Sequence, residues 1–298
     1  MRVAAVDLGT NTTRLLVADV DEERFDELHR ETHITRLGEG VDQRGRLLPV
    51  PIARVRNVLS DYRRTAERLG AERTLLVATS AVRDAENGEA FLGEIEWSYG
   101  FATQLLSGDE EAAMMRRGLG PVEPGTLVVD IGGGSTELVL DDFHISLPLG
   151  SVRFTERHGE DIAASEAAAR ELLPTLEPKR AIGVAGTITT LAALDLGLPE
   201  YDRKRVHGHL LTRDGAQAQL ERLAALPLEE RKLVPALEPD RAPVIVAGAA
   251  ILVAILDRYG LAGIETSERG LLQGAALAAA ELPEPEEGAA PPGAYTCC

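Results

Sequence analysis

Short apolar runs alternate with longer amphipathic stretches along most of this 298-residue chain. Runs of about four to eight apolar residues, bounded by glycine or polar residues, are typical of buried strands. In the first part of the chain they predict strands near residues 2–7, 14–20, 24–36, 74–78 and 102–106. In the second part they predict strands near residues 126–130, 135–141, 143–148, 180–184 and 263–266.

Helices are predicted between these strands, where apolar residues recur three or four positions apart. Ser107 is followed three residues later by Glu110, the capping-box pattern that begins a helix. The other predicted helices cover residues 51–69, 88–99, 150–157, 161–174, 186 onward, 213–224, 228–234, 240–258 and 269–281. Strands alternating with helices, with hairpins opening each half, predict a mixed α/β sheet in both halves.

One strand–turn–strand pattern occurs twice, at residues 3–17 and 126–140. The copies align without a gap, pairing Asp7 with Asp130, Gly9 with Gly132, and Thr13 with Thr136. A turn rich in glycine lets backbone N–H groups converge on an anion. Either copy alone is equally compatible with an ordinary hairpin. Two copies predict two related lobes that face one phosphate.

The glycine- and proline-rich segment 118–125 is the expected seam between the lobes. Residues 1–121 form the first predicted lobe and residues 122–282 the second, with the last helix in a position to pack back on the first. Residues 283–298 are expected to be a disordered tail, because their composition cannot form a core. The chain's two cysteines, Cys297 and Cys298, end this tail, so no disulfide framework or cysteine metal site is expected in the body.

The formal net charge of −17 argues against general nucleic-acid binding, for which a basic face is expected. No window is long and apolar enough to span a bilayer, so no membrane partner is expected. The N-terminus lacks the layout of a signal peptide, which favours a cytoplasmic protein. A polyanionic ligand would need local arginines and Mg²⁺ to offset the negative field of the chain.

Asp7 and Asp130 end apolar strands, where a charged carboxylate is costly without a partner. A carboxylate cannot bind phosphate directly, but it suits a hydrated Mg²⁺ that bridges to phosphate, and other divalent cations also fit. Glu137 is expected to order metal-bound water beside Asp130. The expected phosphate donors lie in or beside the two turns: Thr10, Asn11, Arg14, Gly133, Gly134, Ser135 and Thr136.

Five ordered motifs carry a family resemblance: residues 7–14 (DLGTNTTR), 78–83 (ATSAVR), 106–112 (LSGDEEA), 130–137 (DIGGGSTE) and 185–190 (AGTITT). The duplicated turns resemble those of the actin, hexokinase and sugar-kinase superfamily. The five motifs together resemble the Ppx/GppA family of exopolyphosphatases and guanosine pentaphosphate phosphohydrolases, from residue 1 to about 280. The resemblance implies a two-lobed, actin/hexokinase-like (ribonuclease H-like) α/β fold, with duplicated mixed sheets and flanking helices.

The resemblance also assigns roles to particular residues. Glu111 matches the catalytic base of the family, and Arg83 matches its substrate-phosphate arginine. Gly186 and Thr187 are expected to line the cleft, where related kinases hold adenosine. Two structural alternatives stay open: Glu110 and Glu111 complementing a helix dipole, and Arg83 capping a helix at the surface.

The expected activity is release of terminal orthophosphate from inorganic polyphosphate by attack of a water that Glu111 activates. Removal of the 5′-phosphate of guanosine pentaphosphate (pppGpp) is the alternative within the same class. Longer family members carry a further C-terminal helical domain, so short polyphosphates are the expected substrates here. A nucleotide-binding switch, scaffold or kinase is the alternative from another class, against which the Ser-Gly-Asp-Glu-Glu-Ala motif argues. A homodimer is expected from the resemblance alone.

Overall fold

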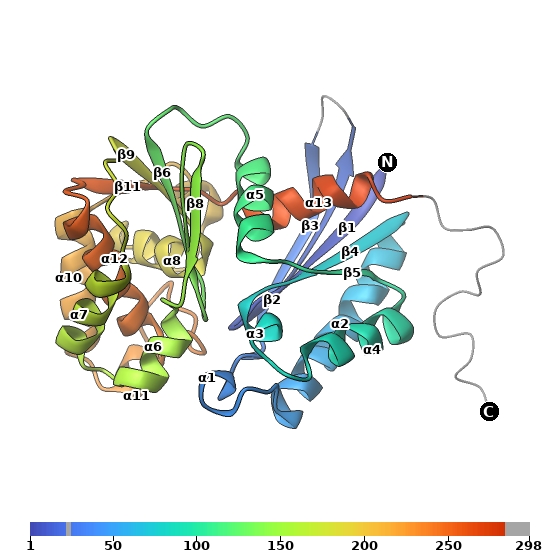
Figure 1. Ribbon diagram of the computed structural model, residues 1–298, viewed down its shortest axis with the longest axis horizontal. Helices are drawn as coiled ribbons and strands as arrows, with labels where there is room; N and C mark the ends of the chain where they lie inside the picture. The colour runs from blue at the N-terminus through green and yellow to red at the C-terminus, as the bar shows by residue number, and fades with distance from the viewer. Residues whose placement is uncertain (22–24, 284–298) are drawn as a thin grey trace. The chain divides into compact units, whose positions relative to one another are not determined.

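The computed structural model describes residues 1–21 and 25–283 of the chain. These form two compact units, one built from Met1–Gly118 and the segment that begins at Leu271, the other from Leu119–Gly270 (Figure 1). From residue 284 onward the expected tail, with Cys297 and Cys298, lies outside the described residues.

The first unit holds a five-stranded sheet in the order β3-β2-β1-β4-β5. Its strands are β1 (Arg2–Leu8), β2 (Thr12–Val20), β3 (Phe25–Ile34), β4 (Arg73–Ala78) and β5 (Ala102–Leu105). The first three form an antiparallel meander. On the other side of β1, β4 pairs parallel with β1, and β5 pairs parallel with β4. The central strand β1 is apolar on both faces, as expected of a strand covered on both sides.

Helices cover both faces of this sheet (Figure 1). Ala4 and Val6 of β1 pack with α2 (Pro49–Leu69) and α4 (Gly88–Tyr99). Val3 and Ala5 point to the opposite face and pack with α13 (Leu271–Ala280). The last helix thus belongs to the first unit, and its Gly274 lies directly against the backbone of Met114 in α5 (Gly108–Leu119).

The second unit repeats this topology with one strand more, in the order β10-β11-β9-β6-β7-β8. Its strands are β6 (Thr126–Ile131), β7 (Thr136–Leu140), β8 (Phe143–Leu147), β9 (Arg180–Val184), β10 (Leu210–Thr212) and β11 (Gly263–Thr266). The meander β6-β7-β8 is antiparallel, β9 and β11 run parallel to β6, and β10 pairs antiparallel at the edge.

The second core forms around α12 (Ile245–Arg258), which is buried from Ile245 to Leu256. The helices that pack on it or near it are α6 (Ser151–His158), α7 (Ile162–Leu172), α8 (Ala185–Asp195) and α10 (Arg213–Ala224). The sequence predicted α12 from residue 240, but residues 241–244 form turns. Pro243 explains the later start, because proline disfavours a helical conformation in the residue before it.

The predicted fold class is confirmed: two mixed sheets, each opened by a meander and flanked by helices. One of the shortest elements, α11 (Leu228–Arg231), falls within a predicted helix. The other short elements were not predicted: α1 (Val41–Arg44), α3 (Ser80–Arg83), α9 (Arg203–Val206) and β10. Segments of three or four residues are too short to show a period. Within residues 1–21 and 25–283, no helix has both the length and the hydropathy needed to cross a membrane.

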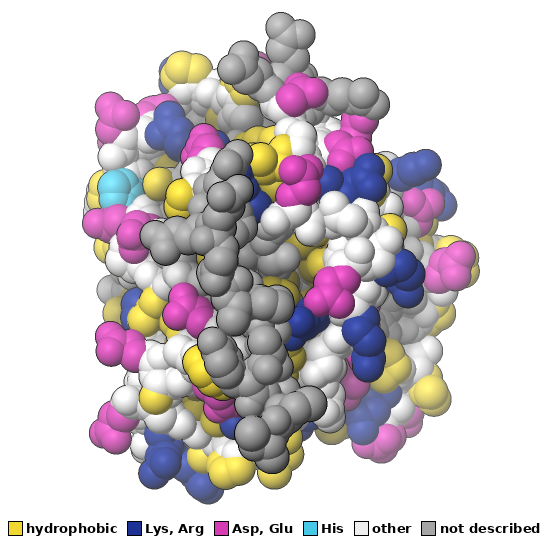
Figure 2. Space-filling model, turned by 90° about the vertical axis from the view of Figure 1, so that its right-hand side faces the viewer, with side chains coloured by type: hydrophobic (Ala, Val, Ile, Leu, Met, Phe, Trp, Pro, Cys, Tyr) yellow, Lys and Arg dark blue, Asp and Glu magenta, His cyan; other side chains and the backbone are white. Residues whose placement is uncertain are grey.

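Charges of both signs are interspersed over the face drawn in Figure 2. The excess of 48 acidic over 31 basic residues in the whole chain gives the net charge of −17. Any anion-binding site must therefore arise from locally placed donors rather than from the overall charge.

Candidate active site

The first glycine turn lies between β1 and β2. Gly9 N–H donates to the Thr12 carbonyl at 3.0 Å, which closes the turn. Asp7 lies directly opposite Arg14 in the strand register, and Arg14 Nη1 is 3.8 Å from Asp7 Oδ2. Burial raises the pKa of Asp7, whereas the charge of Arg14 acts in the opposite direction. Arg14 thus supplies a positive charge beside this carboxylate.

A segment after β3 holds the first turn from outside. Gly38 N–H donates to the Thr10 carbonyl at 2.8 Å, and the N–H groups of Thr35 and Arg36 both donate to the Asn11 carbonyl at 3.0 Å. Position 38 requires glycine, because a Cβ there would overlap the methyl group of Thr10. These bonds fix the backbone of the turn independently of its side chains.

Arg83 and Glu111 lie at the same edge of the sheet as this turn. β1, β4 and β5 are parallel, so their carboxyl ends meet at one edge. Thr10 Oγ1 and Ser80 Oγ are 2.9 Å apart, which joins the turn to α3. Arg83, at the end of α3, donates through Nη1 to the Leu106 carbonyl at 2.7 Å and to Glu111 Oε2 at 3.2 Å. The first unit therefore brings the glycine turn, an arginine and a carboxylate to one edge of its sheet.

The neighbouring glutamates Glu110 and Glu111 have different surroundings. Ser107 N–H donates to Glu110 Oε2 at 2.8 Å and Glu110 N–H donates to Ser107 Oγ at 3.2 Å, which confirms the predicted capping box. The bond from the Ser107 backbone lowers the pKa of Glu110. Glu111 is instead buried, with 6% of its surface exposed, and faces Arg83. Glu110 therefore caps the start of α5, whereas Glu111 faces the arginine.

The second glycine turn repeats the backbone of the first but not its charges. Gly132 N–H donates to the Ser135 carbonyl at 3.0 Å, the counterpart of the bond from Gly9 to Thr12. In place of an Asp–Arg pair, Asp130 lies directly opposite Glu137. Glu137 is buried and accepts from Ser146 Oγ at 2.8 Å.

The N-terminus of α6 holds the second turn. The N–H groups of Val152 and Arg153 donate to the Gly133 carbonyl at 2.8 and 3.1 Å, so helix N–H groups that lack partners within α6 bond the turn. Arg153 Nε donates to the Gly134 carbonyl at 2.7 Å. A Cβ on Gly150 would overlap the backbone of Gly133 and Gly134. The turn and α6 can therefore approach this closely only with glycine at position 150.

Gly38 and Gly150 were not predicted as site residues, although the sequence contains a signal for them. Each follows a leucine after the third strand of its meander, as Leu37-Gly38 and Leu149-Gly150. In both units this glycine lies against the glycine turn. The internal repeat thus extends past the second strand, across an insertion that lengthens the first copy.

Gly186 and Thr187 lie at the start of α8, directly after β9, whose carboxyl end meets that of β6. Ala185 begins the helix with φ of 66°, an unfavourable value for a residue with a side chain. A Cβ on Gly186 would lie 2.5 Å from Nη1 of the buried Arg241, so this guanidinium packs on the glycine. Arg241 was not predicted, because it is 55 residues away from Gly186 in sequence.

The residues predicted to bind metal are divided between the units, with Asp7 in the first and Asp130 and Glu137 in the second. No cluster of three or more His, Cys, Asp or Glu residues in the described parts of the chain is arranged to hold a metal ion. Mg²⁺ typically takes only about one or two protein carboxylates and completes its shell with water and substrate phosphates. Two carboxylates directly opposite in a β-ladder repel each other. Asp130 and Glu137 therefore fit a divalent cation.

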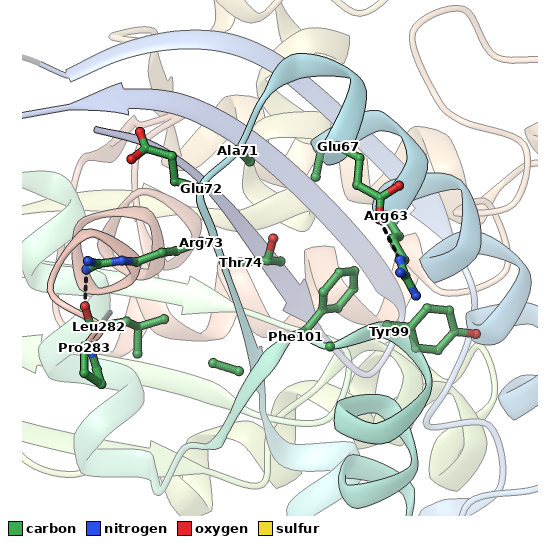
Figure 3. Close-up of a pocket in the computed structure, with 13 residues that line it drawn as sticks. Arg63, Glu67, Ala71, Glu72, Arg73, Thr74, Tyr99, Phe101, Leu282 and Pro283 are labelled. Atoms are coloured by element: carbon green, nitrogen blue, oxygen red, sulfur yellow. Dashed lines mark hydrogen bonds and ion pairs between the residues drawn. The ribbon is translucent and has the colours of Figure 1, made fainter. Parts of the chain in front are cut away.

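A cavity of about 330 Å³ lies elsewhere in the first unit, at the amino ends of β4 and β5 (Figure 3). Arg63 pairs with Glu67 at one side, and Arg73 donates to the Leu282 carbonyl at the other. The glycine turn, Arg83 and Glu111 follow the carboxyl ends of β1, β4 and β5, at the opposite edge of the sheet. This cavity is thus separate from the candidate active site.

Comparison with known proteins places these features in a family. The model of the Ppx/GppA phosphatase family matches residues 16–281. Exopolyphosphatase 2 of Mycobacterium tuberculosis is 36% identical over 314 residues, which cover 94% of this chain and 98% of that protein. Guanosine-5'-triphosphate,3'-diphosphate pyrophosphatase of Vibrio vulnificus is 29% identical, over 92% of this chain and 58% of that protein.

Two solved structures have the same fold over nearly their whole length. An exopolyphosphatase-like protein superposes with a TM-score of 0.85 and 32% identity, covering 93% of this chain and 98% of that one. The PPX-GPPA enzyme of Aquifex aeolicus superposes with a TM-score of 0.78 and 31% identity, covering 93% and 99%. The motifs, the duplicated sheets and the match over residues 16–281 agree: the chain belongs to the Ppx/GppA phosphatase family.

Proposed function

We propose that this phosphoanhydride hydrolase is an exopolyphosphatase, which releases terminal orthophosphate from inorganic polyphosphate with Glu111 as general base. The observation that carries the proposal is the 3.2 Å contact between Arg83 Nη1 and Glu111 Oε2, at the sheet edge where the first glycine turn lies. A neighbouring guanidinium favours the charged form of a carboxylate, in which it can accept a proton. The remaining donors of Arg83 suit phosphate oxygens.

The other residues of the two turns bind and neutralise the substrate. In the first unit, phosphate oxygens are bound by Thr10, Asn11 and Arg14. In the second unit Gly186 and Thr187 line the substrate path, and phosphate oxygens are bound by Gly133, Gly134 and Ser135. The predicted donor Thr136 supports the turn instead, because it is fully buried and its hydroxyl donates to the Leu149 carbonyl. Asp130 and Glu137 would hold Mg²⁺, and Asp7 stays a predicted further ligand. When bound, Mg²⁺ stabilises the negative charge that develops on the phosphate oxygens. Glu111 takes a proton from the attacking water.

We prefer inorganic polyphosphate to pppGpp as the proposed substrate because this chain covers a larger share of the exopolyphosphatase relative than of the guanosine-specific one. This chain covers 98% of the mycobacterial exopolyphosphatase but 58% of the Vibrio enzyme, whose name specifies a guanosine substrate. Hydrolysis of pppGpp is the second candidate, because that relative also matches 92% of this chain. Short polyphosphates are the proposed preference, and the homodimer and the cytoplasmic location stay predictions.

The deciding experiment measures phosphate release from tripolyphosphate, longer polyphosphates, pppGpp and ATP, with Mg²⁺ and with EDTA. We expect the highest kcat/KM for short polyphosphate and no release in EDTA. Release from pppGpp but from no inorganic chain would favour the second candidate. ATP binding by calorimetry, without hydrolysis of any phosphate chain, would favour a nucleotide-binding switch, scaffold or kinase.

Replacing Asp130 with asparagine is expected to weaken the apparent affinity for Mg²⁺ by at least about tenfold, because one of two facing carboxylates loses its charge. Phosphate release should then need higher Mg²⁺ concentrations, as measured by a Mg²⁺ titration of activity and by calorimetry. Asp142→Asn is the control, since this exposed residue lies in the β7–β8 hairpin of the same sheet. An unchanged Mg²⁺ titration in Asp130→Asn would remove Asp130 from the metal site.

A further inference from the structure

Asn11 in the first turn is a buried polar side chain without hydrogen-bond partners. Only 6% of its surface is exposed, and neither Nδ2 nor Oδ1 has a partner within the described structure. The neighbouring hydroxyl groups do have hydrogen-bond partners: Thr10 Oγ1 is bonded to Ser80 Oγ, and Thr13 Oγ1 to Thr35 Oγ1. Buried polar groups in proteins nearly always have partners, so the Asn11 amide calls for one donor and one acceptor from a ligand.

The fold of the turn does not require this amide. The structural bonds at position 11 go to its main-chain carbonyl, which accepts from two N–H groups of the segment after β3. In the gapless alignment of the two copies, Gly134 takes the place of Asn11 and leaves the second turn without a side chain there. The amide is therefore a feature of the first unit alone, the unit that also contains Glu111 and Arg83.

The two ends of an amide need different partners. Nδ2 donates two hydrogens, and an ionised phosphate oxygen accepts them. Oδ1 only accepts, and an ionised phosphate offers it no hydrogen, whereas water does. A water molecule that gives one hydrogen to Oδ1 and the other to a carboxylate directs a lone pair elsewhere. At this edge of the sheet the carboxylate is Glu111, linked to the turn through α3 by the contacts of Ser80 and Arg83.

We propose that Asn11 is a two-sided positioning residue, whose Nδ2 binds a phosphate oxygen and whose Oδ1 orients the attacking water. This inference rests on the proposed function. In the step, the water oxygen forms a bond to phosphorus, and the bridging P–O bond breaks with its electron pair on the shortened chain. The proton of the water passes to Glu111, which later releases it to solvent.

Asn11→Leu tests the proposal, because leucine has a similar shape and neither polar atom. We expect the Tm of the ligand-free protein to stay the same or rise, since two unpaired polar atoms are removed. The kcat for tripolyphosphate is expected to fall at least about 100-fold, as for a misplaced reactant. A structural role would instead lower Tm and activity together, and that result would overturn the proposal, as would an unchanged kcat.

Asn11→Asp separates the two ends of the amide. It keeps an acceptor for water but exchanges the donor for a second acceptor, so KM should rise at least about tenfold while kcat falls less than in Asn11→Leu. Inorganic phosphate should raise the Tm of the wild-type protein but not of either variant. A weaker Mg²⁺ affinity of Asn11→Leu by calorimetry would assign Oδ1 to the metal and overturn the water role.

Thr126→Val is the matched control. Thr126 Oγ1 is also buried without a partner, but it lies at the start of β6 in the second unit. Its removal should leave both Tm and kcat at or above their wild-type values, and a loss of activity comparable to that of Asn11→Leu would overturn the proposal. A wild-type protein that releases no phosphate from any chain would refute the proposed function. The phosphate-dependent Tm shift would then still test the Nδ2 contact.

Discussion

Replacing Glu111 with glutamine is expected to lower kcat for polyphosphate hydrolysis by about 10²- to 10⁴-fold, the usual contribution of a general base. Glutamine has nearly the same shape but cannot accept a proton from water. The position is buried, and Arg83 keeps its bond to the Leu106 carbonyl, so the local fold should persist. Phosphate release under single-turnover conditions measures the loss, and circular dichroism with thermal unfolding verifies the fold.

Glu110→Gln is the control for this substitution, because it makes the same chemical change one residue earlier. Glu110 caps α5 through Ser107, and glutamine serves equally well in a capping box. The control should therefore keep nearly wild-type kcat and Tm. Equal losses in the two variants would indicate a general effect of charge on the helix. Full activity in Glu111→Gln would remove Glu111 from the role of base.

Replacing Gly150 with alanine is expected to have the second large effect. The new Cβ would overlap the backbone of Gly133 and Gly134, which cannot rotate away as a side chain does. Either the glycine turn or the start of α6 must then move, at a cost of about 1–3 kcal/mol or more in the free energy of unfolding. Because the turn positions phosphate oxygens, kcat/KM should fall by about 100-fold. Thermal unfolding and phosphate release are both measured.

Gly93→Ala is the matched control, since this exposed glycine of α4 has open space where a Cβ would lie. Alanine in a helix interior is expected to raise the free energy of unfolding by about 0.5–1 kcal/mol and to leave activity unchanged. A Gly150→Ala variant with wild-type stability and activity would show that the contact between α6 and the turn is dispensable.

The two copies of the glycine turn share their backbone hydrogen bonds but differ in their charged side chains. In both copies a glycine N–H closes the turn on a carbonyl three residues later. The residue opposite the strand-end aspartate differs: Arg14 faces Asp7, whereas Glu137 faces Asp130. The first pair is self-neutralising, and the second gathers negative charge that suits a cation. This difference follows from one position in the alignment, which is arginine in the first copy and glutamate in the second.

Local sequence patterns were enough to predict most strands and helices, the duplicated fold and the family. Apolar periodicity depends on local geometry, so strands such as β1 and helices such as α2 could be predicted within a few residues. The Asp-x-Gly repeat is also local, and its closing bonds span three residues. The capping box at Ser107 and Glu110 was predictable for the same reason. Short segments such as α3 and β10 were not predicted because they are too short to show a periodicity of apolar residues.

Contacts between residues far apart in the sequence could not be predicted in this way. Arg83 and Glu111 are 28 residues apart and come together because β4 and β5 are parallel neighbours whose ends share an edge. Arg241 reaches Gly186, and α13 joins the first unit, through packing of the whole unit rather than through any local period. The lack of partners for the Asn11 amide likewise depends on the residues that surround it in the fold. Periodicity shows that a position is buried, whereas its partners depend on how the elements pack.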